Sequence, residues 1–190
     1  MNNSDFEGNT LELGDPQMRY TLITGPSGSG KTFLANALKC RGIDTYDADT
    51  VRGLTGWFDG AGNRVKFPPG ADRFFLDNHA FLWNRQALID FLASHKVVYL
   101  FGISRNALEM TDLFHDIYFL KVPPAVLAER LRAPDRINPM GSTDYQIEYS
   151  MMWARRNEEK ARKLGIQMID GTQSAEQILS EIVEKVSLRG

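Results

Sequence analysis

Cysteine is almost absent from this sequence. Cys40 is the only one in 190 residues, so the chain cannot form an intrachain disulfide, as is typical of proteins in a reducing compartment. The three histidines lie far apart and do not form, with Cys40, the short ligand spacings of a zinc site. The sequence therefore predicts a cytoplasmic protein without a disulfide framework or a histidine–cysteine metal centre.

Long apolar runs and an excess of positive charge are also missing. No stretch approaches the roughly 20 apolar residues of a membrane-spanning helix, and residues 1–17 lack the basic start and apolar centre of a signal peptide. The formal net charge of -2 does not favour a nucleic-acid protein that depends on bulk positive charge. We expect no membrane partner, favour no nucleic-acid partner, and interpret residues 1–17 as a mobile N-terminal extension.

What the sequence does contain is an alternation of apolar runs and helical patterns, which is typical of a parallel sheet covered by helices. Strands buried on both faces are predicted at 20–24, 43–46, 97–101, 117–120 and 166–169. Helices are predicted at 32–39, at 80–94, from Pro123-Pro124, from Thr143 to about Gly165, and after Ser174. Residues 18–190 are therefore expected to form one three-layer α/β domain with a five-stranded, largely parallel sheet, as a monomer or a homodimer.

One motif carries specific chemistry. The run Gly25-x-x-x-x-Gly30-Lys31-Thr32 matches the phosphate-binding P-loop (Walker A) at every required position, between a predicted strand and a predicted helix. Glycines let successive N–H groups point inward, and the following helix adds the positive end of its dipole. The predicted nucleotide-binding residues of this loop are Gly25, Pro26, Ser27, Gly28, Ser29, Gly30, Lys31 and Thr32.

The P-loop also predicts the cofactors, ATP and Mg²⁺. Lys31 is expected to reach the β- and γ-phosphates, and the Thr32 hydroxyl is expected to bind Mg²⁺. ATP is favoured over GTP because the sequence has no Asn-Lys-x-Asp run of the kind that GTPases use for guanine.

From Arg19 onward the chain resembles the small P-loop kinases of metabolites and nucleotides, such as shikimate kinase, gluconate kinase and adenylate kinase. Asp47-Ala48-Asp49 is similar to the Asp-x-Asp of shikimate-kinase-like enzymes. The resemblance implies that one carboxylate supports the magnesium shell and the other binds or activates the acceptor hydroxyl. Both aspartates are thus predicted as catalytic and acceptor-binding residues, with Asp49 and Thr32 as metal ligands. The alternative for Asp49 is a helix cap.

The third predicted strand departs from that resemblance. It ends in Gly102-Ile103-Ser104-Arg105-Asn106, without the terminal aspartate of motor-type ATPases and without the triple glycine of shikimate kinase. Shikimate itself is therefore not the expected acceptor. Ligands bind at the carboxyl ends of strands in such sheets, so Arg105 is predicted to contact the acceptor. Arg52 is a second candidate, in an acceptor-binding insert at about 50–79 that also contains Arg64, Lys66 and Arg73.

The resemblance further implies a small lid at about residues 132–143, whose arginines close over the phosphates. Arg130 and Arg136 are the catalytic candidates, because a guanidinium group matches phosphate oxygens and screens developing charge. Arg132 is predicted to contact the nucleotide. A solvated surface role is the alternative for each arginine. Thr172 and Gln173, in the loop after the last predicted strand, are expected to bind the base.

The sequence thus predicts an ATP-dependent small-molecule kinase, which transfers the γ-phosphoryl group to a nucleoside, a nucleotide or a sugar-acid or alcohol acceptor. One rival is a toxin-like or resistance-type kinase with a larger or foreign acceptor. Another is a regulatory P-loop switch that hydrolyses its nucleotide slowly without a small acceptor. A third is a nucleic-acid 5′-end kinase, which the acidic charge balance disfavours.

Overall fold

The computed structural model describes residues 18–133 and 140–187, with side chains up to Ile182. The predicted N-terminal extension and half of the predicted lid, including Arg136, lie outside the described residues.

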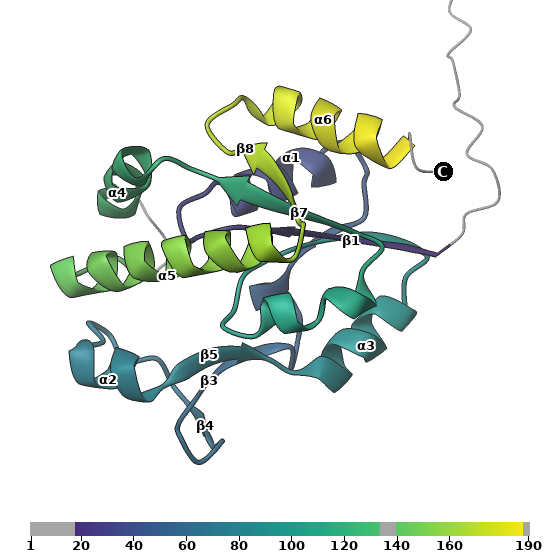
Figure 1. Ribbon diagram of the computed structural model, residues 1–190. Helices are drawn as coiled ribbons and strands as arrows, with labels where there is room; N and C mark the ends of the chain where they lie inside the picture. The colour runs from purple at the N-terminus through teal and green to yellow at the C-terminus, as the bar shows by residue number, and fades with distance from the viewer. Residues whose placement is uncertain (1–17, 134–139, 188–190) are drawn as a thin grey trace, which may run out of the picture.

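A five-stranded parallel sheet forms the centre of the molecule, in the order β2-β6-β1-β7-β8 (Figure 1). Its strands are β1 (Arg19–Thr24), β2 (Thr45–Asp47), β6 (Val97–Phe101), β7 (Asp116–Lys121) and β8 (Gln167–Asp170). Each lies on a predicted apolar run. The three-layer α/β fold and its five-stranded sheet are therefore confirmed.

Helices cover both faces of this sheet because adjacent strand residues point to opposite sides. Ile23 packs against residues of α1 (Lys31–Lys39) and α6 (Ala175–Ser187). Its neighbour Leu22 packs on the other face, against α3 (Arg85–Ala93). On that second face, α5 (Asp144–Lys163) also contributes Ala161, and α4 (Pro124–Arg132) packs on α5. Leu22 and Ile23, on opposite faces of β1, are thus both fully buried, as expected for a central strand covered on both sides.

The predicted acceptor-binding insert and the residues just after it form a second sheet. Its strands β3 (Thr55–Phe58), β4 (Arg64–Val65) and β5 (Ala80–Trp83) are antiparallel, in the order β4-β3-β5. The short helix α2 (Arg73–Asn78) precedes β5, and Figure 1 shows this unit below α5. The sequence predicted an irregular segment here, since its glycines and prolines obscured the strand pattern.

The helix predicted at 80–94 was wrong in its first turn. Residues 80–83 form β5 and pair with β3, and the helix begins only at Arg85. Asn84 fixes this boundary because its side chain accepts a hydrogen bond from the Ala87 N–H (3.0 Å). Pairing with a distant strand therefore outweighed the helical spacing of the apolar residues.

The other helix starts agree with the sequence. Thr143 caps α5 by accepting from the Gln146 N–H (3.2 Å). Ser174 and Gln177 form a reciprocal capping box before α6, and Pro124 lies in the first turn of α4. Among the helices that the structure describes, none is both long enough and apolar enough to span a bilayer.

Candidate active site

The P-loop connects β1 to α1 at the carboxyl edge of the sheet. A Cβ atom on Gly25 would lie 2.8 Å from the Leu120 carbonyl oxygen of β7, so any side chain there would collide with backbone. Gly30, which caps α1, has φ +96°, a conformation that L-residues rarely adopt. The two glycines therefore make the tight turn and the close approach of backbones that a phosphate-binding loop requires.

Lys31 folds back over this loop. Its Nζ donates to the carbonyl oxygens of Gly25 (2.6 Å) and Pro26 (2.8 Å) and to Ser29 Oγ (3.4 Å). The ammonium group is thus held above the loop, where its charge and the N–H groups at the start of α1 act on the same small volume.

The two aspartates after β2 lie beside the loop in distinct arrangements. Asp47 Oδ2 accepts from the Thr32 hydroxyl (3.2 Å), and its Oδ1 accepts from the Asp49 N–H (3.0 Å). Asp47 therefore caps the short 3-10 turn at Ala48–Thr50 and joins it to the P-loop. The cap considered for Asp49 is therefore made by Asp47.

The charge of Asp49 is strongly influenced by its surroundings. The side chain keeps solvent contact, but protein atoms crowd the carboxylate. Desolvation and, next, the charge of Asp47 raise its pKa to about 6, while Lys31 lowers it. Raised carboxylate pKa values cluster at functional sites.

Arg130 also reaches the P-loop. From α4, its Nη1 donates to the Gly171 carbonyl oxygen (3.1 Å) and, over a longer distance, to that of Gly28 (3.5 Å). It therefore ties the P-loop to the loop after β8, where the exposed Thr172 and Gln173 lie. Thr172 bonds to Asp170 through both its N–H and its hydroxyl. Arg132 is exposed at the end of α4.

The basic residues of the predicted acceptor site differ in their exposure and in their contacts. Arg52 is exposed. Arg64 lies along β3 and donates to the Thr55 carbonyl oxygen (2.6 Å), and Arg73 pairs with Asp77 (3.4 Å). Arg105 is different, because it extends from the loop after β6 over the ring of Trp153 on α5, with 5.4 Å between Cζ and the ring centroid.

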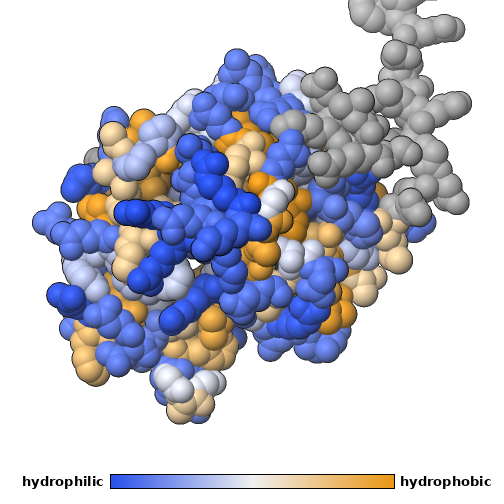
Figure 2. Space-filling model, in the orientation of Figure 1, coloured by the Kyte–Doolittle hydropathy of each residue, from blue (hydrophilic) through white to orange (hydrophobic). Residues whose placement is uncertain are grey.

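Sequence reasoning missed the contribution of α5. Tyr145, Tyr149 and Trp153 are spaced four residues apart and form an aromatic row along one side of the helix. The Tyr145 hydroxyl donates to Asp77 of α2 (2.8 Å), so the row faces the insert. Figure 2 shows mainly hydrophilic side chains over the outward side of α5. The aromatic spacing in the sequence was a signal that could have identified this row.

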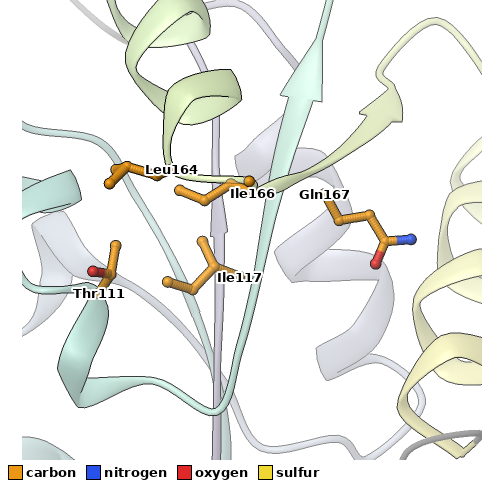
Figure 3. Close-up of a pocket in the computed structure, with 6 residues that line it drawn as sticks. Thr111, Ile117, Leu164, Ile166 and Gln167 are labelled. Carbon is orange, nitrogen blue, oxygen red and sulfur yellow. The ribbon is translucent and has the colours of Figure 1, made fainter.

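A pocket of about 200 Å³ lies away from these groups (Figure 3). Ile117 and Gln167 in its lining stand at the amino-terminal ends of β7 and β8, and Leu164 and Ile166 follow α5. The P-loop follows the carboxyl end of β1, so this pocket is at the opposite edge of the sheet and is separate from the candidate active site.

Comparison with known proteins agrees with this geometry at the level of the fold. No protein-family model and no curated protein matches the sequence. A shikimate kinase structure from Bacteroides thetaiotaomicron is similar with a TM-score of 0.53 at 22% identity, over 87% of this chain and 98% of that one.

Two further structures extend the comparison. A shikimate kinase from Acinetobacter baumannii in complex with shikimate gives a TM-score of 0.55 at 16% identity, over 90% of this chain and 96% of that one. A deoxyadenosine kinase from M. mycoides with bound dATP gives 0.51 at 10% identity, over 90% and 100%. The chain therefore has the fold of the small P-loop kinases, as the resemblance in sequence predicted, and its subfamily is left open.

Proposed function

We propose that this protein is an ATP-dependent kinase that transfers the γ-phosphoryl group to a small-molecule acceptor. The observation that carries the proposal is the grouping of Lys31, Thr32, Asp47 and Asp49 at one end of a P-loop kinase fold. A triphosphate bound in the P-loop would direct its terminal phosphate towards the two aspartates, where a kinase needs its acceptor hydroxyl.

The oxygen donors beside the loop suit a hard cation such as Mg²⁺. Thr32 and Asp47 would hold it, because their side chains are already in contact (3.2 Å). The sequence assigned the aspartate of the metal shell to Asp49, and we revise that proposal to Asp47. When bound, Mg²⁺ neutralises charge on the phosphate oxygens.

Asp49 is the proposed general base. A carboxylate with a pKa of about 6 is ionised at neutral pH and is a stronger base than an ordinary aspartate. It would orient the acceptor hydroxyl and accept its proton as the hydroxyl oxygen attacks the γ-phosphorus. Lys31 and Arg130 would donate to the phosphate oxygens, with Arg130 leaving its present carbonyl partners.

The direct test is ADP release from magnesium-ATP across a panel of nucleosides, nucleoside monophosphates, sugar acids and amino alcohols. We expect one acceptor class to increase the rate, and Lys31→Ala to lower kcat/KM by about 10²–10³-fold with the fold intact. Arg155→Gln is the control, because Arg155 is exposed on α5 and its ion pair within the described residues is with Glu159, one turn along the same helix.

The rival functions give different results in the same assay. Tight ATP binding with no acceptor dependence would reject the kinase and favour a regulatory switch. Turnover that requires oligonucleotide ends and falls steeply with salt would instead indicate a 5′-end kinase. Normal turnover in Lys31→Ala would contradict the assignment of the P-loop.

A further inference from the structure

Phe33 presents a largely exposed aromatic ring beside the P-loop. It is the third residue of α1, directly after Thr32, and its relative exposure is 69%. The helix packs on α6 through Leu34, Ala35 and Leu38. Within the described part of the chain, the ring of Phe33 belongs to none of the hydrophobic clusters. Single exposed apolar residues are common on protein surfaces, so the position of this one must show whether it has a task.

The backbone of Phe33 belongs to the phosphate-binding part of α1. The N–H groups in the first turn of a helix have no earlier helical carbonyl oxygen to bond to, and they point out of the helix end towards a bound anion. The first backbone bond across this turn runs from the Leu34 N–H to the Gly30 carbonyl oxygen (3.0 Å). Thr32 and Phe33 come before that bond, so phosphates held by their N–H groups would lie next to the Phe33 side chain.

The sheet order sets the direction of a bound nucleotide. β2, which ends at Asp47, and β8 are the opposite outer strands of the sheet, with β1 and its P-loop between them. The Thr32 hydroxyl contacts Asp47 (3.2 Å), so the reacting γ-phosphate is expected on the β2 side. The nucleoside end then extends towards the loop after β8, where a Cβ on Gly171 would lie 3.3 Å from the Ser29 carbonyl oxygen.

The position of Phe33 on the helix directs its ring away from the sheet. Successive helix residues are about 100° apart, so its side chain diverges from that of Thr32, which points to Asp47. It also diverges from Leu34, which is buried against α6. The ring is therefore exposed at the phosphate end of α1, between the β2 side and α6.

Thr172, which is expected to bind the base, already uses its donors within its own loop. It donates both its N–H (2.9 Å) and its hydroxyl (2.7 Å) to Asp170. Neither donor is then available to recognise a base by hydrogen bonding. An aromatic ring needs no such donor, because stacking uses the face of the base, which every nucleobase has.

We propose that Phe33 is a stacking platform for the nucleobase of the bound triphosphate. Its ring adds affinity that ATP and GTP share, whereas the choice between them is left to other residues. This inference rests on the nucleotide-binding half of the proposed function and adds a binding residue to it.

Ligands with and without a base give the first test. The dissociation constants of the magnesium complexes of ATP, GTP and inorganic triphosphate are measured by calorimetry for the parent protein and Phe33→Ala. We expect Phe33→Ala to raise Kd about five- to a hundredfold for ATP and equally for GTP, as expected for losing one base–aromatic stack. The Kd for inorganic triphosphate, which has no base, should not change.

Phe74→Ala is the matched control, because Phe74 is also exposed (73%) but lies on α2 of the insert. It should leave all three constants unchanged, and Phe33→Tyr, which keeps the ring, should bind as the parent does. Unchanged ATP affinity in Phe33→Ala would overturn the platform. An equal loss for inorganic triphosphate would also overturn it, because Phe33 would then support the loop and not the base. A loss confined to one of the two nucleotides would contradict an affinity that both share.

A second test observes the contact directly and needs no turnover. With 5-fluorotryptophan the chain carries Trp57, Trp83 and Trp153 as reporters, and Phe33→Trp adds a fourth ¹⁹F signal. ATP and GTP should shift that fourth signal through the ring current of the stacked base, and inorganic triphosphate should shift it far less. Equal shifts from all three ligands would reject the platform.

The outcomes separate this inference from the kinase function. If the base-dependent effects occur without turnover of any acceptor, the platform is supported and phosphoryl transfer is rejected. If Phe33→Ala transfers phosphate with the parent's KM for ATP, the kinase is supported and the platform is rejected.

Discussion

At the scale of single residues, Asp47 and Asp49 differ because their partners differ. Asp47 accepts hydrogen bonds from the Thr32 hydroxyl and from the Asp49 N–H. Asp49 is crowded by protein and lies near the charge of Asp47, so its pKa is raised to about 6. These different surroundings support the separate roles proposed for the two carboxylates, Asp47 in the metal shell and Asp49 at the acceptor hydroxyl.

The pKa of Asp49 predicts a pH profile. The base must be ionised, so kcat/KM should fall below about pH 6. Asp49→Asn should lower kcat by about 10²–10⁴-fold with little change in ATP affinity. Steady-state kinetics between pH 5 and 8, with ATP binding measured separately, test both expectations. Unchanged activity in Asp49→Asn would remove Asp49 from the mechanism.

The same residue should reduce stability at neutral pH. The folded pKa of about 6 exceeds the ordinary 3.8, so the folded state binds the proton more tightly and loses stability as pH rises from about 4 to 6. Asp49→Asn should therefore raise Tm at pH 7.5 by about 2–4 °C, or about 1 kcal/mol once solvent screening of this exposed group is allowed for. The gain should disappear near pH 4. A loss of Tm at pH 7.5 would contradict the assigned environment.

At the scale of elements, Gln146 joins α5 to the insert. Its side chain is fully buried. Its Oε1 accepts from the N–H groups of Gly141 and Ser142 and from the Ser142 hydroxyl, and its Nε2 donates to the Ala71 carbonyl oxygen (2.9 Å). One amide therefore fixes the start of α5 against the chain before α2, and with it the position of the aromatic row.

Removing this amide should be costly because the buried Ala71 carbonyl oxygen and the N–H groups of Gly141 and Ser142 lose this partner. We expect Gln146→Ala to lower the free energy of unfolding by about 2–4 kcal/mol, measured by urea denaturation. Gln86→Ala is the control, since Gln86 is exposed on α3 and bonds only to Asp90. It should change stability by less than about 0.5 kcal/mol. Equal effects of the two variants would show that Gln146 does not join these elements.

At the scale of the whole molecule, the parallel sheet brings the residues of the candidate active site together. Four segments from separate parts of the sequence build this site: the P-loop, the turn at Ala48–Thr50, and the loops after β6 and β8. Each segment follows the carboxyl end of a strand of the same parallel sheet, so the sheet places all four at one edge. Arg130 then links the P-loop to the loop after β8. A ligand bound in the P-loop should therefore stabilise the domain as a whole.

Thermal unfolding tests this coupling. Magnesium-ATP at about 100 times its Kd should stabilise the protein by about 2.7 kcal/mol, which for this length corresponds to a rise in Tm of about 5–11 °C. Lys31→Ala should show little rise at the same concentration, and Arg155→Gln should match the parent. An equal rise in Lys31→Ala would place the nucleotide elsewhere.

The sequence by itself determined the parallel sheet, most helix starts and the P-loop. These features depend on local signals, such as apolar runs, capping residues and glycines at fixed spacing. Such signals act through interactions within a few residues of each other, so they can be recognised in the sequence alone. These signals predicted the nucleotide-binding residues of the P-loop. The resemblance to small P-loop kinases predicted the roles of Asp47 and Asp49.

Only the tertiary structure decided the rest. β5 was predicted as helix because its apolar residues suit either element, and pairing with β3, more than twenty residues earlier, made it a strand. Trp153 and Arg156 lie about fifty residues after Arg105, and packing alone brings them together. Asp47, and not Asp49, bonds to Thr32 because of the turn between β2 and the insert. Such contacts depend on how separate elements pack, which local sequence does not encode.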